Sequence, residues 1–231
     1  MANNILTKQQ HNMQGNDLHI VLLFLSPYSK INNALPNYFG MEKQGEFVNT
    51  CTPIVHHAFR QAGKLDAVFV IATNTVQEQI AGYTQTHLEK FKADCGEFTE
   101  QFIDVAYNEK NFAEQENFNV VCTAAEKINA FIRSRTDKPQ ECRIKLCLDM
   151  TGGLRHTALV SISLAHLLRY EYPLLSTDLP YSMMKFNCSE KKDKTENARC
   201  EDCNRHGRCE QHTELVDISS AQNIFDIISG T

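Results

Sequence analysis

The chain has 231 residues, of which 42% are hydrophobic and 22% are charged, a composition that predicts a folded globular protein. Its formal net charge of -5 argues against the basic excess with which proteins hold long nucleic acids, so we expect no long nucleic acid as a partner. The longest apolar runs, such as IVLLFL at 20–25, fall far short of the roughly 20 residues that cross a bilayer, and we expect no membrane partner.

The amino-terminal segment and the cysteines indicate the compartment. Residues 1–17 are polar and lack the apolar core of a secretion signal, so we predict a flexible amino-terminal arm on a cytoplasmic protein. In that compartment the nine cysteines are expected to be reduced thiols or metal ligands.

The first half of the chain alternates strand and helix patterns. A β-branched and leucine-rich run at 18–26 predicts a strand buried on both faces. Residues 49–63 predict a helix with Thr52 as its N-cap, Pro53 at its first position and Gly63 at its end. A second buried strand is predicted at 65–73. The following segment, 74–96, is predicted as a helix that begins at Asn74 or Thr75.

The second half continues the alternation. The expected elements are a weaker strand at 98–107, a helix at 118–136, a strand at 143–150, a helix at 156–171, and two late strands at 180–187 and 213–219. Strands and helices at this spacing predict an α/β fold, a three-layer sandwich with a mainly parallel sheet and right-handed crossovers. We expect a single domain over 18–231, interrupted by a polar, cysteine-rich insertion at 188–212.

Ligands of open α/β sheets bind outside the carboxyl ends of the strands, and three segments of this chain are expected there. The candidate binding residues are Ser26, Pro27 and Tyr28 after the first strand, Thr73, Asn74 and Thr75 after the second, and Asp149, Thr151, Gly152, Gly153, Arg155 and His156 in the stretch DMTGGLRH. The dinucleotide, P-loop and hydrolase-elbow fingerprints are absent from the sequence, which removes three common enzyme classes.

The DMTGGLRH stretch carries the strongest signal. Gly152 and Gly153 let the backbone approach a ligand closely, Thr151 adds a hydroxyl, and Asp149 is expected to cap the turn. Arg155 and the adjacent His156 fall in the first turn of a helix, where a cation gains nothing from the helix dipole, so a ligand or solvent exposure explains them better. The alternative is a tight strand-to-helix turn. The full combination favours an anion or nucleotide site.

The other two segments leave alternatives open. Tyr28 could stack on a base, or its ring could pack under the loop. The polar residues 73–75 suit a ribose or base edge, although helix capping explains each of them separately. The adjacent His56 and His57 are interpreted as structural histidines and receive no chemical role.

The insertion holds a cluster of potential metal ligands. Its thiols are Cys188, Cys200, Cys203 and Cys209, with His206 or His212 as an alternative ligand. The C-x2-C spacing of Cys200 and Cys203 matches the chelating turn of structural zinc sites, which would order a polar segment without a core of its own. Because a second C-x2-C is missing, a flexible, reduced loop is the other interpretation. No cofactor is expected to be required for ligand binding.

Several of these stretches resemble the CRISPR-associated Rossmann-fold domain, abbreviated CARF. The likeness covers roughly 18–230 apart from the insertion, and D-x-T-G-G-x-R-H is its most specific part; IVLLFLSPYS, PIVHHAFRQAGKLDAVFVIATNTV and the two late strands add generic matches. The resemblance implies a Rossmann-like homodimer that binds cyclic oligoadenylate, the second messenger of antiviral type III CRISPR defence. It also implies allosteric control of an effector domain, which we expect beyond the carboxyl terminus.

The resemblance leaves other functions to be distinguished. A ring nuclease that slowly cleaves the cyclic oligoadenylate would use the same loops, with His156 or Arg155 assisting. A nucleotide-binding regulatory module outside CRISPR defence is a further alternative. The leading prediction is the sensor, which would hold cyclic tetra- or hexa-adenylate in a pocket shared by two copies.

Overall fold

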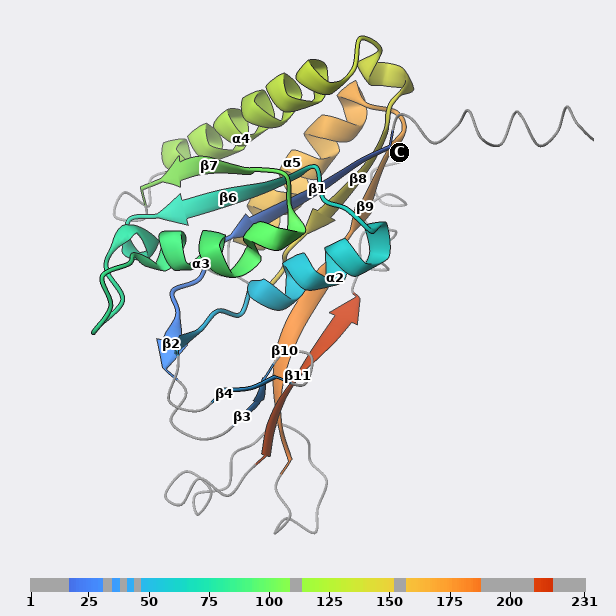
Figure 1. The fold of residues 1–231 in the computed structure, drawn as a ribbon. Helices are drawn as coiled ribbons and strands as arrows, with labels where there is room; N and C mark the ends of the chain where they lie inside the picture. The colour runs from blue at the N-terminus through green and yellow to red at the C-terminus, as the bar shows by residue number, and fades with distance from the viewer. Residues whose placement is uncertain are drawn as a thin grey trace, which may run out of the picture.

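The computed structural model describes residues 17–30, 35–37, 41–43, 47–108, 114–151, 157–187 and 210–217. Its centre is a five-stranded parallel sheet with the strand order β7-β6-β1-β8-β9 (Figure 1). The strands are β1 (Asp17–Phe24), β6 (Ala67–Thr73), β7 (Phe102–Tyr107), β8 (Arg143–Leu148) and β9 (Leu175–Asp178). The chain adds β6 and β7 on one side of β1 and then crosses to add β8 and β9 on the other side, which is the strand order 3-2-1-4-5 of Rossmann-like sheets. The topological switch point therefore lies between β1 and β8.

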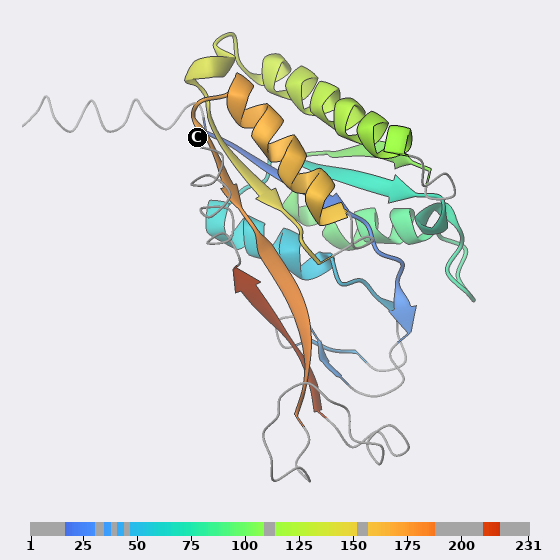
Figure 2. The same cartoon turned by 180° about the vertical axis from the view of Figure 1, so that it is seen from behind.

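Helices cover both faces of the sheet and complete the predicted three layers. The helices α2 (Thr52–Ala62) and α3 (His87–Cys95) lie on one face, whereas α4 (Glu114–Arg135) and α5 (Thr157–Glu171) lie side by side on the other (Figures 1 and 2). The expected α/β class with a parallel sheet is confirmed.

Alternation along β1 explains how one strand serves two cores. Val21 and Leu23 point into the core under α2 and α3, whereas Ile20, Leu22 and Phe24 point into the core under α4 and α5. All five side chains are at most 1% exposed. Burying an aliphatic or aromatic side chain of this size contributes about 1.5–3 kcal/mol, so β1 is the main anchor of the sheet.

Two sequence predictions about helices are wrong in detail. The N-cap of α2 is Cys51 rather than Thr52, while Pro53 stands in the first turn and Gly63 ends the helix in a left-handed conformation with φ 75°, as expected. The predicted helix over 74–96 forms a short 3-10 helix at Thr75–Gln77 and then a turn segment, and α3 begins at His87. A capping box between Thr86 and Glu89 starts α3, and this stronger local signal overrides the apolar spacing upstream.

A second group of strands lies beyond the carboxyl edge of the main sheet. The predicted late strands are β10 (Pro180–Asn187) and β11 (Glu210–Asp217), and they pair with each other as an antiparallel sheet of their own (Figure 2). Short pairs that the sequence did not predict join β2 (Ser29–Lys30) to β5 (Phe47–Val48) and β3 (Leu35–Asn37) to β4 (Met41–Lys43). The edge strand β9 was also missed.

Parts of the predicted domain organisation fall outside the described residues. Residues 1–16 of the expected arm do so, whereas Asp17 is already the first residue of β1. Residues 210–212, which the sequence assigned to the insertion, belong to β11. No helix in the described part of the chain is both long and apolar enough to cross a membrane.

Candidate functional site

The carboxyl ends of three adjacent strands bring the predicted segments together. In the order β6-β1-β8, these strands are followed by residues 74–77, 25–28 and 149–151, respectively. Because the strands are parallel, all three segments leave the sheet at the same edge. The switch point between β1 and β8, where α/β folds bind ligands, is the centre of this edge.

Asp149 is fixed in position by its backbone and its side chain. Its N–H donates to the carbonyl oxygen of Leu22 at 2.9 Å, and its Oδ1 accepts the N–H of Thr151 at 2.7 Å. The residue is 2% exposed. The next residue, Met150, donates its N–H to the carbonyl oxygen of Pro180 at 3.1 Å, which joins the segment to β10. The expected turn-capping role of Asp149 is thus seen in the contact with Thr151.

Asn49 holds the loop after β1 against the start of α2, and the sequence analysis missed it. Its Nδ2 donates to the carbonyl oxygen of Ser26 at 2.5 Å, and its Oδ1 accepts the N–H of Cys51 at 2.8 Å. The side chain is buried, with 2% exposure of the residue. A lone Asn before a helix is a common cap signal, but nothing in the sequence reveals that it also reaches back to the preceding strand.

The Cys51 thiol lies under the switch point. It is fully buried and donates from Sγ to the carbonyl oxygen of Phe24 at 3.4 Å. Burial, and then the negative charge of Asp149, raise the pKa of this thiol well above its usual value. A protonated, buried thiol is inert, so Cys51 is a structural residue rather than a nucleophile.

The ring of Tyr28 packs under its own loop, which is one of the two interpretations that the sequence left open. The residue is 5% exposed and packs in the core beneath α2 and α3. Its hydroxyl donates to Oδ2 of Asp94 at 2.7 Å, and its backbone N–H donates to Nδ1 of His87 at 2.8 Å. Burial and the Asp94 hydrogen bond raise the pKa of the Tyr28 hydroxyl. Its neighbour Pro27 is exposed at the edge, and Ser26 is partly exposed.

The residues after β6 are divided between the sheet and the surface. Thr73 is 7% exposed and is the last residue of the strand, paired with Tyr107 of β7. Asn74 donates from Nδ2 to Oδ1 of Asn108 at 3.0 Å and makes no side-chain capping bond. Thr75 begins the 3-10 helix and is partly exposed. Of this trio, Asn74 and Thr75 face the open edge.

Several predicted ligands fall outside the described residues. These are Gly152, Gly153, Arg155 and His156 of the glycine-containing turn, and Cys188, Cys200, Cys203, Cys209 and His206 of the insertion. The backbone of His212 belongs to β11. Within the described ranges, no group of three or more His, Cys, Asp or Glu side chains is arranged to hold a metal ion.

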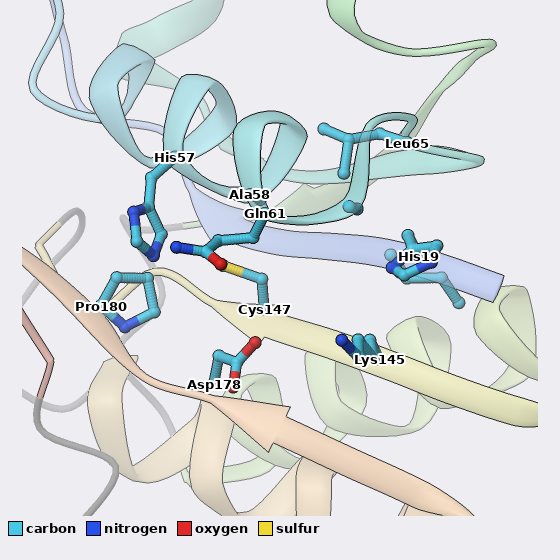
Figure 3. Close-up of a pocket in the computed structure, with 11 residues that line it drawn as sticks. His19, His57, Ala58, Gln61, Leu65, Lys145, Cys147, Asp178 and Pro180 are labelled. Atoms are coloured by element: carbon cyan, nitrogen blue, oxygen red, sulfur yellow. The ribbon is translucent and has the colours of Figure 1, made fainter. Parts of the chain in front are cut away.

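A cavity of about 310 Å³ lies away from the predicted loops, between α2 and the strands β1 and β8 (Figure 3). Its lining includes His57 and Gln61 of α2, Lys145 and Cys147 of β8, and Asp178 at the end of β9. We expected no role for His57. The signal that could have found this site is the alternation in RIKLCL, where lysine and cysteine share one face of a central strand.

The described part of the carboxyl edge offers hydrogen bonding rather than acid–base chemistry. Its partly exposed polar side chains are those of Ser26, Asn74, Thr75 and Thr151, which are hydroxyls and an amide. Asp149 is buried and engaged with the backbone. Such an edge can bind the oxygen atoms of a phosphate or a ribose. No protein-family model and no curated protein matches this chain, so the arguments for its function come from its own residues.

Proposed function

We propose that this chain is a sensor domain of the CARF class that binds cyclic oligoadenylate in antiviral type III CRISPR defence. The observation that carries the proposal is the position of the segment that begins DMT. It starts at the switch point, where Asp149 is bonded to Leu22 of β1 and to Thr151. In the sequence, the glycines and the arginine of the motif follow within a few residues of Asp149, whose own position is at the edge where α/β folds take nucleotides.

The chemistry of this edge suits a ring of phosphates and adenines. The hydroxyls of Ser26, Thr75 and Thr151 can bond to ribose and phosphate oxygens, and Arg155 supplies a cation that binds a phosphate in a bidentate manner. A cyclic tetra- or hexa-adenylate has internal symmetry, so two copies related by a twofold axis can present the same loops to each half of the ring. The bound ring then biases an effector domain.

An exposed apolar stripe on α5 supports pairing of two copies. Leu159, Leu167 and Tyr170 of α5 are 63%, 49% and 92% exposed, and the exposed Ser163 lies between the first two; Leu174, in the turn after the helix, is 49% exposed. The spacing of four, four and three residues from Leu159 to Tyr170 produces a single uncharged line along the helix. Apolar lines of this kind on a soluble protein mark interaction sites. The helix also follows the DMTGGLRH stretch directly, so pairing through α5 brings both copies of the ligand loops toward one axis.

The binding experiment uses calorimetry with cyclic tetra-adenylate and cyclic hexa-adenylate, and linear tetra-adenylate as the control. We expect one ring size to bind and the linear molecule to bind more weakly. Arg155→Ala should lower the affinity at least about tenfold, since a charge-assisted hydrogen bond contributes about 1.5–3 kcal/mol. Lys138→Ala is the matched control, because this exposed cation pairs locally with Glu141. No heat of binding from either ring would overturn the proposal.

Pairing of two copies is tested by analytical ultracentrifugation, which measures the monomer and dimer populations with and without cyclic oligoadenylate. Leu167→Asp should shift the chain toward the monomer, because it places a desolvated charge in the stripe. Lys138→Glu changes charge on an exposed surface elsewhere and should leave the pairing unchanged. Chromatography of the ring after long incubation separates the sensor from the ring nuclease, because a sensor returns the ring intact.

A further inference from the structure

The face of β8 and β9 that looks toward α2 is polar at positions where a covered sheet would be apolar. The strand register places Lys145 between His19 of β1 and Ser176 of β9, and it places Cys147 opposite Asp178. On the opposite face of β8, Ile144, Leu146 and Leu148 are buried against α4 and α5. The two faces of one central strand therefore serve different purposes, a core on one side and a polar cavity on the other.

Four polar side chains of this cavity have no hydrogen-bond or ion-pair partner among the described residues. Within the described part of the chain, no hydrogen bond, ion pair or ring contact engages the side chains of His57, Gln61, Lys145 or Asp178. Lys145 and Asp178 carry opposite charges and line the same cavity, yet they do not form an ion pair. Figure 3 shows Gln61 and His57 reaching from α2 toward β8, and Asp178 turning its carboxylate toward Cys147.

The strand register sets the spacing of the two charged residues on the sheet. Lys145 lies opposite Ser176, two residues before Asp178 on the neighbouring strand. Two residues along a strand and one strand spacing across place their Cα atoms about 8 Å apart. A molecule that carries an anionic and a cationic group a few bonds apart can engage both of these exposed side chains at once.

We propose that this cavity binds a free α-amino acid. Lys145 and His19 hold the carboxylate, Asp178 and the Gln61 amide oxygen hold the ammonium group, and His57 lies at the mouth of the cavity. Ala58, Ala62 and Leu65 form an apolar wall for the ligand side chain. The volume of about 310 Å³ lies at the lower end of small-molecule sites and accepts an amino acid but not a cyclic oligonucleotide.

The histidine provides an independent readout. Burial lowers the pKa of His19, the negative charge of Asp66 opposes this shift, and the positive charges of Lys145 and Lys64 add to it, against a smaller effect of Asp17. A carboxylate seated between Lys145 and His19 places a negative charge beside the imidazole, so a bound amino acid raises the pKa of His19. The ammonium end of the ligand lies toward β9, away from His19, and leaves this change in place.

The test is thermal unfolding of the whole chain with each common L-amino acid at millimolar concentration, followed by calorimetry with the amino acid that stabilises most. We expect at least one to raise the unfolding temperature, and its affinity to fall about tenfold or more in Lys145→Met and in Asp178→Asn. Both side chains are exposed, so the variants should fold. The amine and the carboxylic acid that correspond to the bound amino acid should each fail to bind.

Lys138→Met, on a distant exposed surface, is the control for a general loss of charge. NMR titration of His19 should show a higher pKa with the amino acid bound. The proposal is overturned if no amino acid stabilises the chain, or if both cavity variants bind it as the parent does. Cyclic oligoadenylate binding should survive in both variants, so a failure here is distinguishable from a failure of the sensor function.

Discussion

The hydroxyl of Tyr28 donates a hydrogen bond to Oδ2 of Asp94 at 2.7 Å, and this bond ties the loop after β1 to the helix α3. Asp94 also accepts a hydrogen bond from Lys90 at 3.2 Å, and the Lys90 ammonium lies 5.5 Å from the centre of the Tyr28 ring. A tyrosine at the predicted ligand edge thus serves as the anchor of its own loop.

Tyr28→Phe should therefore lower the free energy of unfolding by about 1–3 kcal/mol, because it removes a hydrogen bond to a charged acceptor and leaves the ring in place. Urea unfolding of Tyr28→Phe, Asp94→Asn and the double variant measures the coupling between the two side chains. A coupling energy of zero would contradict this account.

The contact between Tyr28 and His87 predicts a pH dependence of stability. His87 Nδ1 accepts the Tyr28 N–H, so this bond requires the neutral imidazole. Burial lowers the pKa of His87 below 6.5, against a smaller opposing effect of Glu78. A lowered folded-state pKa means that the stabilisation is complete above about pH 6.5 and is lost as the pH falls through the lower value.

His87→Asn isolates this effect, because the Asn Oδ1 can accept the same N–H and does not titrate. Urea midpoints measured between about pH 7 and about pH 5 should fall less in the variant than in the parent chain. His19 and His56 also have lowered pKa values and contribute in the same direction, so a residual slope is expected. Equal slopes in both proteins would remove His87 as a cause.

Asn49→Ala should impair stability and ligand binding together. The substitution leaves the Ser26 carbonyl and the Cys51 N–H without their buried partner, and each such group costs about 1–3 kcal/mol. The loop after β1 then loses its attachment to α2, so the affinity for the cyclic ring should also fall. Asn129→Ala, which removes a bond to Glu171 on the opposite face, should reduce stability without changing that affinity.

Two glycines provide a matched test of backbone conformation. Gly63 has φ 75° and Gly96 has φ -61°, and a Cβ atom at either position meets nothing within 4 Å. Gly63→Ala should cost about 1–2 kcal/mol, because an L-residue is strained at positive φ. Gly96→Ala should be neutral or stabilise by up to about 1 kcal/mol, since the unfolded chain loses freedom. Thermal unfolding compares the two, and equal effects would contradict the explanation.

Elemental analysis tests directly whether zinc binds the cysteine cluster Cys188, Cys200, Cys203 and Cys209. Elemental analysis of the purified chain should find zinc, and Cys200→Ser with Cys203→Ser should remove it, because the chelating pair is lost. Cys95→Ser is the control, since this thiol is buried and distant in sequence from the cluster. If the parent protein contains no zinc although no chelator was used in its preparation, the insertion is better explained as a flexible loop with reduced cysteines.

Periodicity in the sequence predicted the sheet because the same residues carry both the pattern and the packing. The run from Ile20 to Leu25 is continuously apolar, and this part of the strand is buried from both sides. Over 74–86 the apolar residues are spaced like a helix, but Gly82 takes φ 82° and Thr86 starts a new helix with its capping box. The capping box and the turn at Gly82 determine where the helix begins, and hydrophobic periodicity carries no information about either.

The contacts of the site depend on residues far apart in the chain, which explains why the sequence revealed only some of them. Positions at the carboxyl ends of strands follow from the strand assignments, so Asp149 and Thr151 were found at the expected edge. The bond from Asn49 to Ser26 joins residues 23 positions apart across an unpredicted excursion of short strands. The pairing of Cys147 with Asp178 required β9, which the sequence analysis did not contain.

The hydrogen bond from Met150 to Pro180 connects the ligand edge to the rest of the molecule. Pro180 is the first residue of β10, and Leu179 alone separates it from β9. The backbone at Met150 is therefore bonded directly to the base of the β10–β11 sheet, so the ligand edge and this second sheet share one point of attachment at the end of β9.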